Sequence, residues 1–328
     1  MADSNRGKIM RIAVAAVLIM AMVFLANFLI FKIANRRVKP DKEINIVATN
    51  YVAYDLVRAI VGETTGEQIN IGMLLRPGSE AHSFEPSPQD IAAINKADLL
   101  VYVGGESEEW VDKLLDSNEI NKEKTVRMMD LVELKEEDEI EEDVEEHANE
   151  HAVEYDEHIW TSPKNAKILL DKIKQKMVYL FPQFKESFEV NAGLYGDELK
   201  DIDTELTRIV KDAKRRELVF ADRFPFKYLV DDYGLEYVAA FPGCSEQTEA
   251  SSATIAKLID KVKNDNLGVI LKIELTSDKL AQVIAESTGA KILTLNAAHN
   301  ISQEDFDNGV RLVDLMRDNL VVLAEALN

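Results

Sequence analysis

The chain has 328 residues, which is enough for two domains of roughly 150 residues each. Its 46% content of hydrophobic residues supports sizeable cores and excludes global disorder. Lys and Arg number 38 against 59 Asp and Glu, so the formal net charge is −21. This balance argues against nucleic-acid binding, which needs clustered basic residues, and favours cationic ligands. The single cysteine, Cys244, excludes an intrachain disulfide and a cysteine-based zinc finger.

Much of the negative charge lies in one segment. Residues 135–158 contain 13 acidic residues and one lysine, which accounts for −12 of the −21. So many like charges predict a solvated acidic loop, at residues 135–157, rather than a stable helix. The loop contains His147 and His151, which would capture cations weakly and raise their concentration near a tighter site. A purely solubilising insertion is an equally good interpretation.

An apolar run precedes the predicted globular part. Residues 12–33 are apolar except for Asn27 and Lys32, and about 20 such residues span a hydrocarbon core of roughly 30 Å. Basic residues flank the run on both sides, so charge alone does not determine its orientation. We predict an uncleaved transmembrane signal anchor rather than a cleaved signal peptide. Residues 1–11 would be cytoplasmic, and residues 34–43 would form a linker.

The next part of the chain alternates between short apolar runs typical of strands and the amphipathic pattern of helices. Four short apolar runs predict strands, with amphipathic helices between them. The strands are expected at residues 44–49, 68–75, 99–103 and 125–129, and the helices at 53–61, 88–96 and 108–115. This β-α-β pattern predicts an N-terminal lobe, residues 44–182, built on a mainly parallel sheet covered by helices.

The last third of the chain repeats this pattern without repeating the sequence. Strands are expected at residues 217–221, 236–241, 269–273 and 291–295, and helices at 226–233, 252–264, 278–287 and 302–327. The prediction is a second α/β lobe, residues 216–328, of similar architecture.

A single long helix is predicted between the lobes. Apolar residues recur at steps of four and three from Phe188 to Ala213, which gives an uninterrupted stripe along residues 183–213. At 1.5 Å per residue, a helix of about 30 residues is about 45 Å long, the span of two small lobes. We predict a rigid inter-lobe helix within residues 183–215. One more amphipathic helix packed on a sheet is the alternative.

Two histidines of the first lobe are candidate ligands. His82 lies in a loop, residues 77–88, that leaves the strand ending near Leu75, and open α/β sheets place ligands at the carboxyl ends of their strands. His158 precedes another capped helix, and its neighbouring acidic residues could hold the second imidazole nitrogen, as at metal sites. For both histidines the alternative is a loop residue that caps or packs.

Polar residues follow the strands of the second lobe in a corresponding way. Asp222, Glu274 and Asn296 come directly after predicted strands, and His299 follows three residues later. Asp222 pairing with Arg223 and Glu274 capping a helix are the plainer interpretations. Imidazoles from one lobe that face carboxylates from the other would suit Zn²⁺, and a carboxylate-rich set would suit Mn²⁺.

Four segments together resemble the metal-specific solute-binding proteins of bacterial ABC importers, the zinc/manganese cluster. They are residues 78–88 (GSEAHSFEPSP), 102–106 (YVGGE), 156–166 (DEHIWTSPKNA) and 233–235 (YGL). The resemblance covers residues 44–327. It implies two lobes joined by one long helix, with a metal buried between them. It also implies delivery of that metal to a permease and its ATPase outside the cytoplasm.

The resemblance further implies which residues bind the metal. His82 and His158 match the first two ligands of the family. Spacing back from residues 233–235 puts Arg223 at the third position, so Asp222 takes it only with a shift of one residue. The fourth position, an acid in the family, is Asn296 here, so that Glu274, His299 or water would complete the shell. The lipid-attachment cysteine of the family is missing, and the helix at residues 12–33 would replace the lipid anchor.

The sequence as a whole therefore predicts a monomeric receptor anchored in the cell membrane, with most of the chain extracellular. Its cargo would be Zn²⁺, alternatively Mn²⁺, and no nucleic acid is expected to bind. Two alternatives stay open: a metal-dependent hydrolase using the same residues, and a surface metal-storage or adhesion protein. No phosphate-binding, dinucleotide-binding, serine-hydrolase or zinc-protease motif occurs in the sequence.

Overall fold

A computed structural model describes residues 43–65, 68–80, 83–117, 121–137, 154–243 and 249–328. The predicted anchor at residues 12–33 and most of the acidic loop lie outside these ranges. Within them, every helix is too short or too polar to cross a bilayer.

The first lobe is built on a four-stranded parallel sheet in the order β2-β1-β3-β4. The strands are β1 (Ile44–Ala48), β2 (Ile69–Met73), β3 (Leu99–Tyr102) and β4 (Thr125–Arg127). Successive side chains of β3 enter different cores: Leu99 and Val101 pack on one face, and Leu100 and Tyr102 pack on the other. The sheet is therefore buried on both sides, as the continuous apolar strand sequences predict.

Helices cover both faces of this sheet. Helices α2 (Tyr51–Thr65) and α5 (Pro163–Leu180) share the larger core, and α3 (Pro88–Lys96) and α4 (Glu109–Asp116) share the smaller one. Ser87 caps α3 through the backbone of Asp90, with Pro88 at the first helical position, so the predicted start of this helix is confirmed.

The second lobe has the same strand order, β6-β5-β7-β8, and its sheet is also parallel. The strands are β5 (Glu217–Phe224), β6 (Glu236–Pro242), β7 (Val269–Lys272) and β8 (Lys291–Thr294). Its helices are α7 (Lys227–Tyr233), α8 (Ser252–Asn264) and α9 (Lys279–Thr288). The predicted architecture of two parallel-sheet lobes flanked by helices is confirmed.

Strand β5 is longer than the sequence predicts. A bulge between Phe220 and Arg223 shifts the register, after which Arg223 and Phe224 pair with the end of β6. Asp222 and Arg223 therefore lie within the strand rather than in a loop after it, and the predicted end at residue 221 is wrong.

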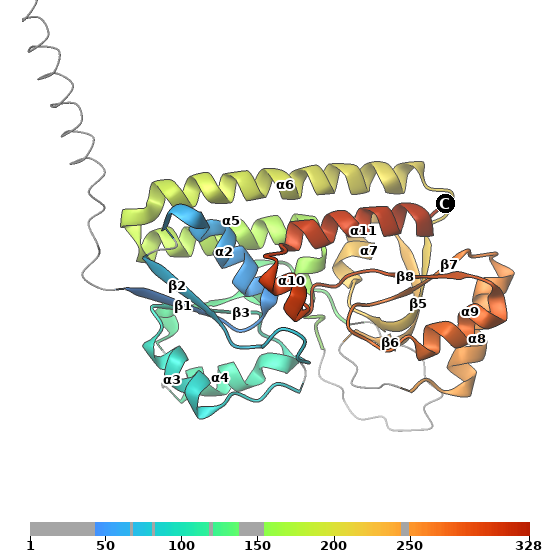
Figure 1. The fold of residues 1–328 in the computed structure, drawn as a ribbon, viewed down its shortest axis with the longest axis horizontal. Helices are drawn as coiled ribbons and strands as arrows, with labels where there is room; N and C mark the ends of the chain where they lie inside the picture. The colour runs from blue at the N-terminus through green and yellow to red at the C-terminus, as the bar shows by residue number, and fades with distance from the viewer. Residues whose placement is uncertain (1–42, 66–67, 81–82, 118–120, 138–153, 244–248) are drawn as a thin grey trace, which may run out of the picture. The chain divides into compact units, whose positions relative to one another are not determined.

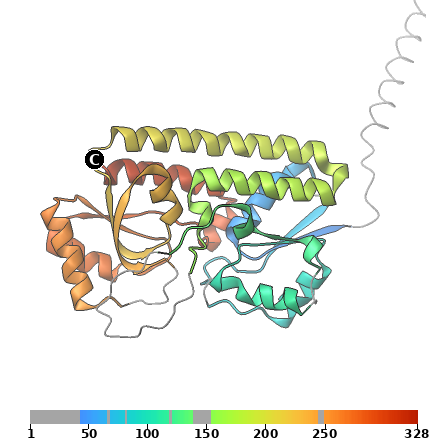
Figure 2. The same ribbon diagram turned by 180° about the vertical axis from the view of Figure 1, so that it is seen from behind.

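Helix α6 (Lys185–Asp212) is the predicted inter-lobe helix. Its stripe is buried along its whole length: Phe188 and Leu199 belong to the core of the first lobe, and Leu206 and Ile209 to that of the second. Figures 1 and 2 show α6 running along one side of both sheets. The two lobes thus share one continuous helix as a brace.

The C-terminal segment forms a second brace instead of the single helix predicted at residues 302–327. It is divided into α10 (Gln303–Asp307) and α11 (Leu312–Ala326). Gly309 between them adopts a left-handed backbone conformation (φ 71°) that favours glycine. The prediction of one helix is therefore wrong.

Helix α11 also contacts both lobes, because its first turns enter the core of the first lobe and its last turn enters that of the second. It runs beside α6 in both views of the ribbon (Figures 1 and 2). Residues from 298 to 316, assigned by the sequence to the second lobe, thus contribute Ala298, Ile301 and Met316 to the first core.

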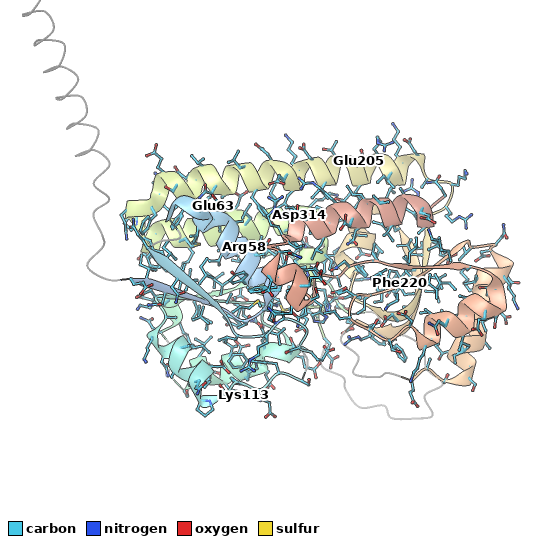
Figure 3. The ribbon with its side chains drawn as sticks, viewed as in Figure 1. Arg58, Glu63, Lys113, Glu205, Phe220 and Asp314 are labelled. Atoms are coloured by element: carbon cyan, nitrogen blue, oxygen red, sulfur yellow. The ribbon has the colours of Figure 1, made fainter. Side chains whose placement is uncertain are left out.

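One buried carboxylate joins the helices of this brace. Asp55 of α2 accepts hydrogen bonds from the Tyr195 hydroxyl of α6 and from the backbone N–H of Leu312 at the start of α11 (2.9 Å). Arg58 pairs with the same carboxylate and donates to the carbonyl of Val310 (2.8 Å). Figure 3 shows Arg58 and Asp314 near one another beneath α6. The brace therefore depends on an acid that the hydrophobic pattern does not reveal.

We expect Asp55→Ala to lower the free energy of unfolding by about 3 kcal/mol, because it leaves buried donors without their acceptor. Chemical denaturation measures the change. Glu109→Ala is the control, since its pair with Lys113 is exposed (2.8 Å) and should contribute less than about 1 kcal/mol. Equal losses in the two variants would contradict a structural role for Asp55.

Candidate metal centre

His158 is held in one orientation by its own loop. Its backbone N–H donates to Asp156 Oδ1 (2.7 Å), and its Nδ1 lies 3.0 Å from the same oxygen. A carboxylate oxygen only accepts, so the proton belongs on Nδ1 and the lone pair of Nε2 is available to a ligand. The side chain of His158 is fully buried. The prediction that a neighbouring acid holds the second nitrogen is confirmed for Asp156.

His299 reaches the same place from the other lobe, on the segment after β8. Glu274 accepts the backbone N–H groups of Ala297 (2.7 Å) and His299 (3.0 Å). Asn296 Oδ1 accepts the backbone N–H of Ala298 (2.7 Å). Ala298 has a left-handed φ of 54°, which turns the chain here. The rings of His158 and His299 meet with centroids 4.6 Å apart at an interplanar angle of 86°.

Glu157 completes a cluster with the two histidines. One ligand atom from each of Glu157, His158 and His299 lies within 4.8 Å of the others. Glu157 Oε2 accepts the Ser107 hydroxyl (2.8 Å), and the loop of Ser107 approaches closely because Gly105 has no Cβ. A Cβ on Gly105 would lie 2.4 Å from Glu157 Oε2. Two imidazoles and a carboxylate form a donor set that suits Zn²⁺.

Burial sets the protonation of the groups in this cluster. It raises the pKa of Glu157, although His158 and Ser107 oppose the rise. Burial also disfavours imidazolium at His158, but Asp156 outweighs it and raises the pKa of the imidazole. Nearby, burial raises the pKa of Glu108 to about 7. A divalent cation would replace the protons that the cluster holds, so its binding must weaken as the pH falls.

The other carboxylates predicted as ligands have backbone partners. Asp222 accepts the N–H groups of Arg223 (2.8 Å) and Ile273 (3.2 Å), as well as the Thr276 hydroxyl. Glu274 accepts two N–H groups of the segment of His299, and the side chain of Asn296 accepts the N–H of Ala298, while the backbone N–H of Asn296 donates to Asn319. These side chains fix the loops at the carboxyl ends of the strands, and only His299 of the second-lobe candidates reaches the described cluster.

His82, His147 and His151 lie outside the described residues. The loop that leads to His82 is described as far as Glu80, and it is tied to the segment of His299. The backbone N–H of Gly78 donates to the carbonyl of Ile301 (2.8 Å), and the side-chain amide of Asn300 donates to the carbonyl of Arg76 (3.2 Å). The described part of this loop therefore ends beside the segment that carries His299.

Sequence reasoning missed Glu157 as a candidate ligand. It stands next to His158, but in a tract with 13 acidic residues no pattern distinguishes it. Trp160 was missed too: its indole N–H donates to the carbonyl of Ala297 (2.8 Å), which joins the segments of the two histidines. The acidic residues beside His158 were the one available signal, and they did not indicate which acid turns inward.

Comparisons with known proteins identify the family of the chain. Residues 46–326 match the family model of the periplasmic component A of the zinc-uptake complex. The chain belongs to this family. It is 34% identical over 292 residues to the high-affinity zinc uptake system protein ZnuA of Bacillus subtilis, covering 88% of this chain and 89% of that protein. It is 33% identical over 286 residues to the zinc-binding lipoprotein AdcA of Streptococcus pneumoniae, covering 87% of this chain but 56% of AdcA. The chain thus spans about half the length of that relative.

Solved structures of family members share the fold. The Zn(II)-bound ZnuA-like domain of Streptococcus pneumoniae AdcA superposes with a TM-score of 0.72 at 31% identity, covering 87% of this chain and 99% of that one. The metal-dependent lipoprotein YcdH of Bacillus subtilis gives 0.73 at 30% identity, covering 87% and 100%. The laminin-binding protein Lmb of Streptococcus agalactiae, described as a bifunctional adhesin and metal transporter, gives 0.70 at 26%, covering 87% and 100%. The family is one of metal-binding transport components and not of enzymes, which decides against the hydrolase alternative.

We expect Asp156→Asn to weaken zinc binding by about 10- to 100-fold, because a neutral amide holds the Nδ1 proton less firmly and makes the imidazole less basic. Competition with a chromophoric chelator measures the affinity. Glu154→Gln neutralises an exposed acid of the same segment and should bind zinc like the unchanged chain. Unaltered affinity in Asp156→Asn would show that the carboxylate does not tune the ligand.

Proposed function

We propose that the chain is the substrate-binding component of a metal ABC importer, which captures Zn²⁺ between its lobes and delivers it to the permease and ATPase. The cluster of Glu157, His158 and His299 carries this proposal, because it joins ligand atoms of both lobes within 4.8 Å. Its imidazole-rich donors favour Zn²⁺ over Mn²⁺. The names of the relatives, a zinc uptake protein and a zinc-binding lipoprotein, support the same cargo.

We further propose that His82 joins these three residues as a ligand. Asp222, Glu274 and Asn296 would hold the surrounding loops in place, since their side-chain oxygens accept backbone N–H groups. His147 and His151 would act only in weak capture. The two bracing helices, α6 and α11, would limit how far the lobes separate when the metal enters or leaves.

Zinc titration of the full chain against a competing chelator tests the proposal. We expect one tight site. His158→Ala and His299→Ala should each lower its zinc affinity by more than about 100-fold, which is the upper end of the effect of residues that only support a ligand. Asp222→Asn should bind zinc nearly unchanged. Full affinity in a His158→Ala, His299→Ala double variant would overturn the ligand assignment. Tighter binding of Mn²⁺ would overturn the choice of metal but not the receptor function.

Replacement of residues 138–153 by a short Gly/Ser linker is the control in this titration, and it separates a receptor from a storage protein. The two ends of this segment lie side by side. The backbone N–H of Glu137 donates to the carbonyl of Glu154 (3.0 Å), and the backbone N–H of Asp156 donates to the carbonyl of Lys135 (3.0 Å). A short linker therefore closes the gap. A receptor keeps its one tight site in this variant, whereas a storage protein loses most of its bound zinc.

We propose that the apolar residues 12–33 anchor the chain in the cell membrane, with the lobes outside the cytoplasm. The length and composition of this run support an anchor, as the sequence indicates. Alkaline carbonate extraction of membranes tests it, because a spanning helix stays in the pellet. Release of a chain shortened by its first 30 to 40 residues would contradict the anchor and favour a cleaved signal peptide.

A further inference from the structure

A cavity of about 220 Å³ lies between residues 78–80 of the first lobe and residues 223 and 273–276 of the second, and His299 of the candidate metal centre lines it. Arg223, Glu80, Thr276 and Asn300 line it as well. A water molecule occupies about 30 Å³ of liquid, so this space admits a small organic or inorganic anion. The cavity is therefore both large enough and close enough to hold a second ligand beside the metal.

Arg223 provides this cavity with a permanent positive charge. Its side chain is only 13% exposed, although a guanidinium remains protonated and carries five donors in a planar fork. In the described part of the chain its side chain has one ion pair, with Glu80, at the long distance of 3.4 Å. Glu80 is itself half exposed at 49%. A largely desolvated cation of this kind favours a closer, bidentate acceptor.

The neighbouring carboxylates are committed elsewhere. Asp222 Oδ1 accepts the backbone N–H of Arg223, and its Oδ2 accepts Ile273 and Thr276. The two oxygens of Glu274 accept the backbone N–H groups of Ala297 and His299. Neither can offer two oxygens to the guanidinium without releasing its own loop, so among the described residues Glu80 is the one carboxylate that the guanidinium pairs with.

We propose that this cavity binds a small carboxylate-type anion, such as bicarbonate or a short organic acid, which Arg223 holds beside the metal. The inference rests on the proposed function, because a divalent cation at His299 and the guanidinium line the same cavity. Like charges repel strongly at low dielectric, and an anion between them converts that repulsion into two attractions. Its planar oxygens match the fork of Arg223, and one oxygen can face the metal. Zinc and the anion would then bind cooperatively.

Zinc affinity of the full chain, measured at fixed ionic strength and buffered free zinc, tests the cooperativity. We expect bicarbonate or acetate to raise the affinity by at least about 10-fold over chloride alone, as coupling of this size is typical between linked sites. Arg223→Met should abolish the dependence on the anion. Arg223→Lys, which keeps the charge without the fork, should lose most of it. Glu80→Gln, the matched control, should keep it, because it removes only the competing carboxylate.

Equal zinc affinity in all three anions would overturn the inference and leave the proposed function intact. The same anion dependence in Arg223→Met would overturn the assignment to Arg223. A second measurement needs no zinc: with a chelator present, acetate should raise the melting temperature of the unchanged chain but not of Arg223→Met. Absence of this shift contradicts the anion site. Failure to bind zinc in every anion, in contrast, overturns the proposed function itself.

Discussion

The candidate metal centre depends on a fixed distance between the lobes, and the buried carboxylate of Asp55 secures that distance. His158 belongs to the first lobe, and His299 lies on the segment after the last strand of the second, where Glu274 accepts its N–H while Ala298 and Ile301 enter the first core, so the cluster forms where the two lobes meet. Asp55 joins α2 of the first lobe to α6 and α11, which both enter the cores of the two lobes. An uncompensated charge at this position would be costly, so the brace holds only while its donors remain in place.

Around the centre, acidic side chains have two roles: some orient other groups, and one belongs to the candidate ligand cluster. Asp156 orients an imidazole, Glu157 turns toward the metal position, and Glu274 fixes the segment that presents His299. All three are carboxylates, but Glu274 accepts two backbone N–H groups whereas Asp156 and Glu157 accept one each. A carboxylate that accepts two backbone N–H groups has little capacity left for a cation. Arg223 has the opposite character, since among the described residues its guanidinium pairs with a single carboxylate, Glu80, at 3.4 Å.

Such an arrangement suits a protein that must release what it binds. Ligands drawn from two lobes lose their common geometry when the lobes move apart, even slightly, whereas a site within one lobe would not. The two long helices α6 and α11 restrict that motion. An anion held by Arg223 would add a metal ligand that can dissociate on its own. In the sequence, residues 135–158 carry −12 of the net charge of −21 and end at His158, so most of that charge belongs to one segment.

The sequence by itself determined the two parallel sheets and the brace α6, and it pointed to His158 as a candidate ligand. Those features follow from local periodicity, caps and a short motif, which neighbouring residues settle among themselves. Tertiary structure decided which acid joins the histidine cluster, because Glu157 lies within 4.8 Å of His158 and His299 while the side chains of Asp222 and Glu274 accept backbone N–H groups of their own loops. It also decided the break before α11 and the extension of β5 past Asp222, which depend on Gly309 and on pairing with β6. Contacts between residues more than a hundred positions apart carry no periodic signal, so only the folded chain reveals them.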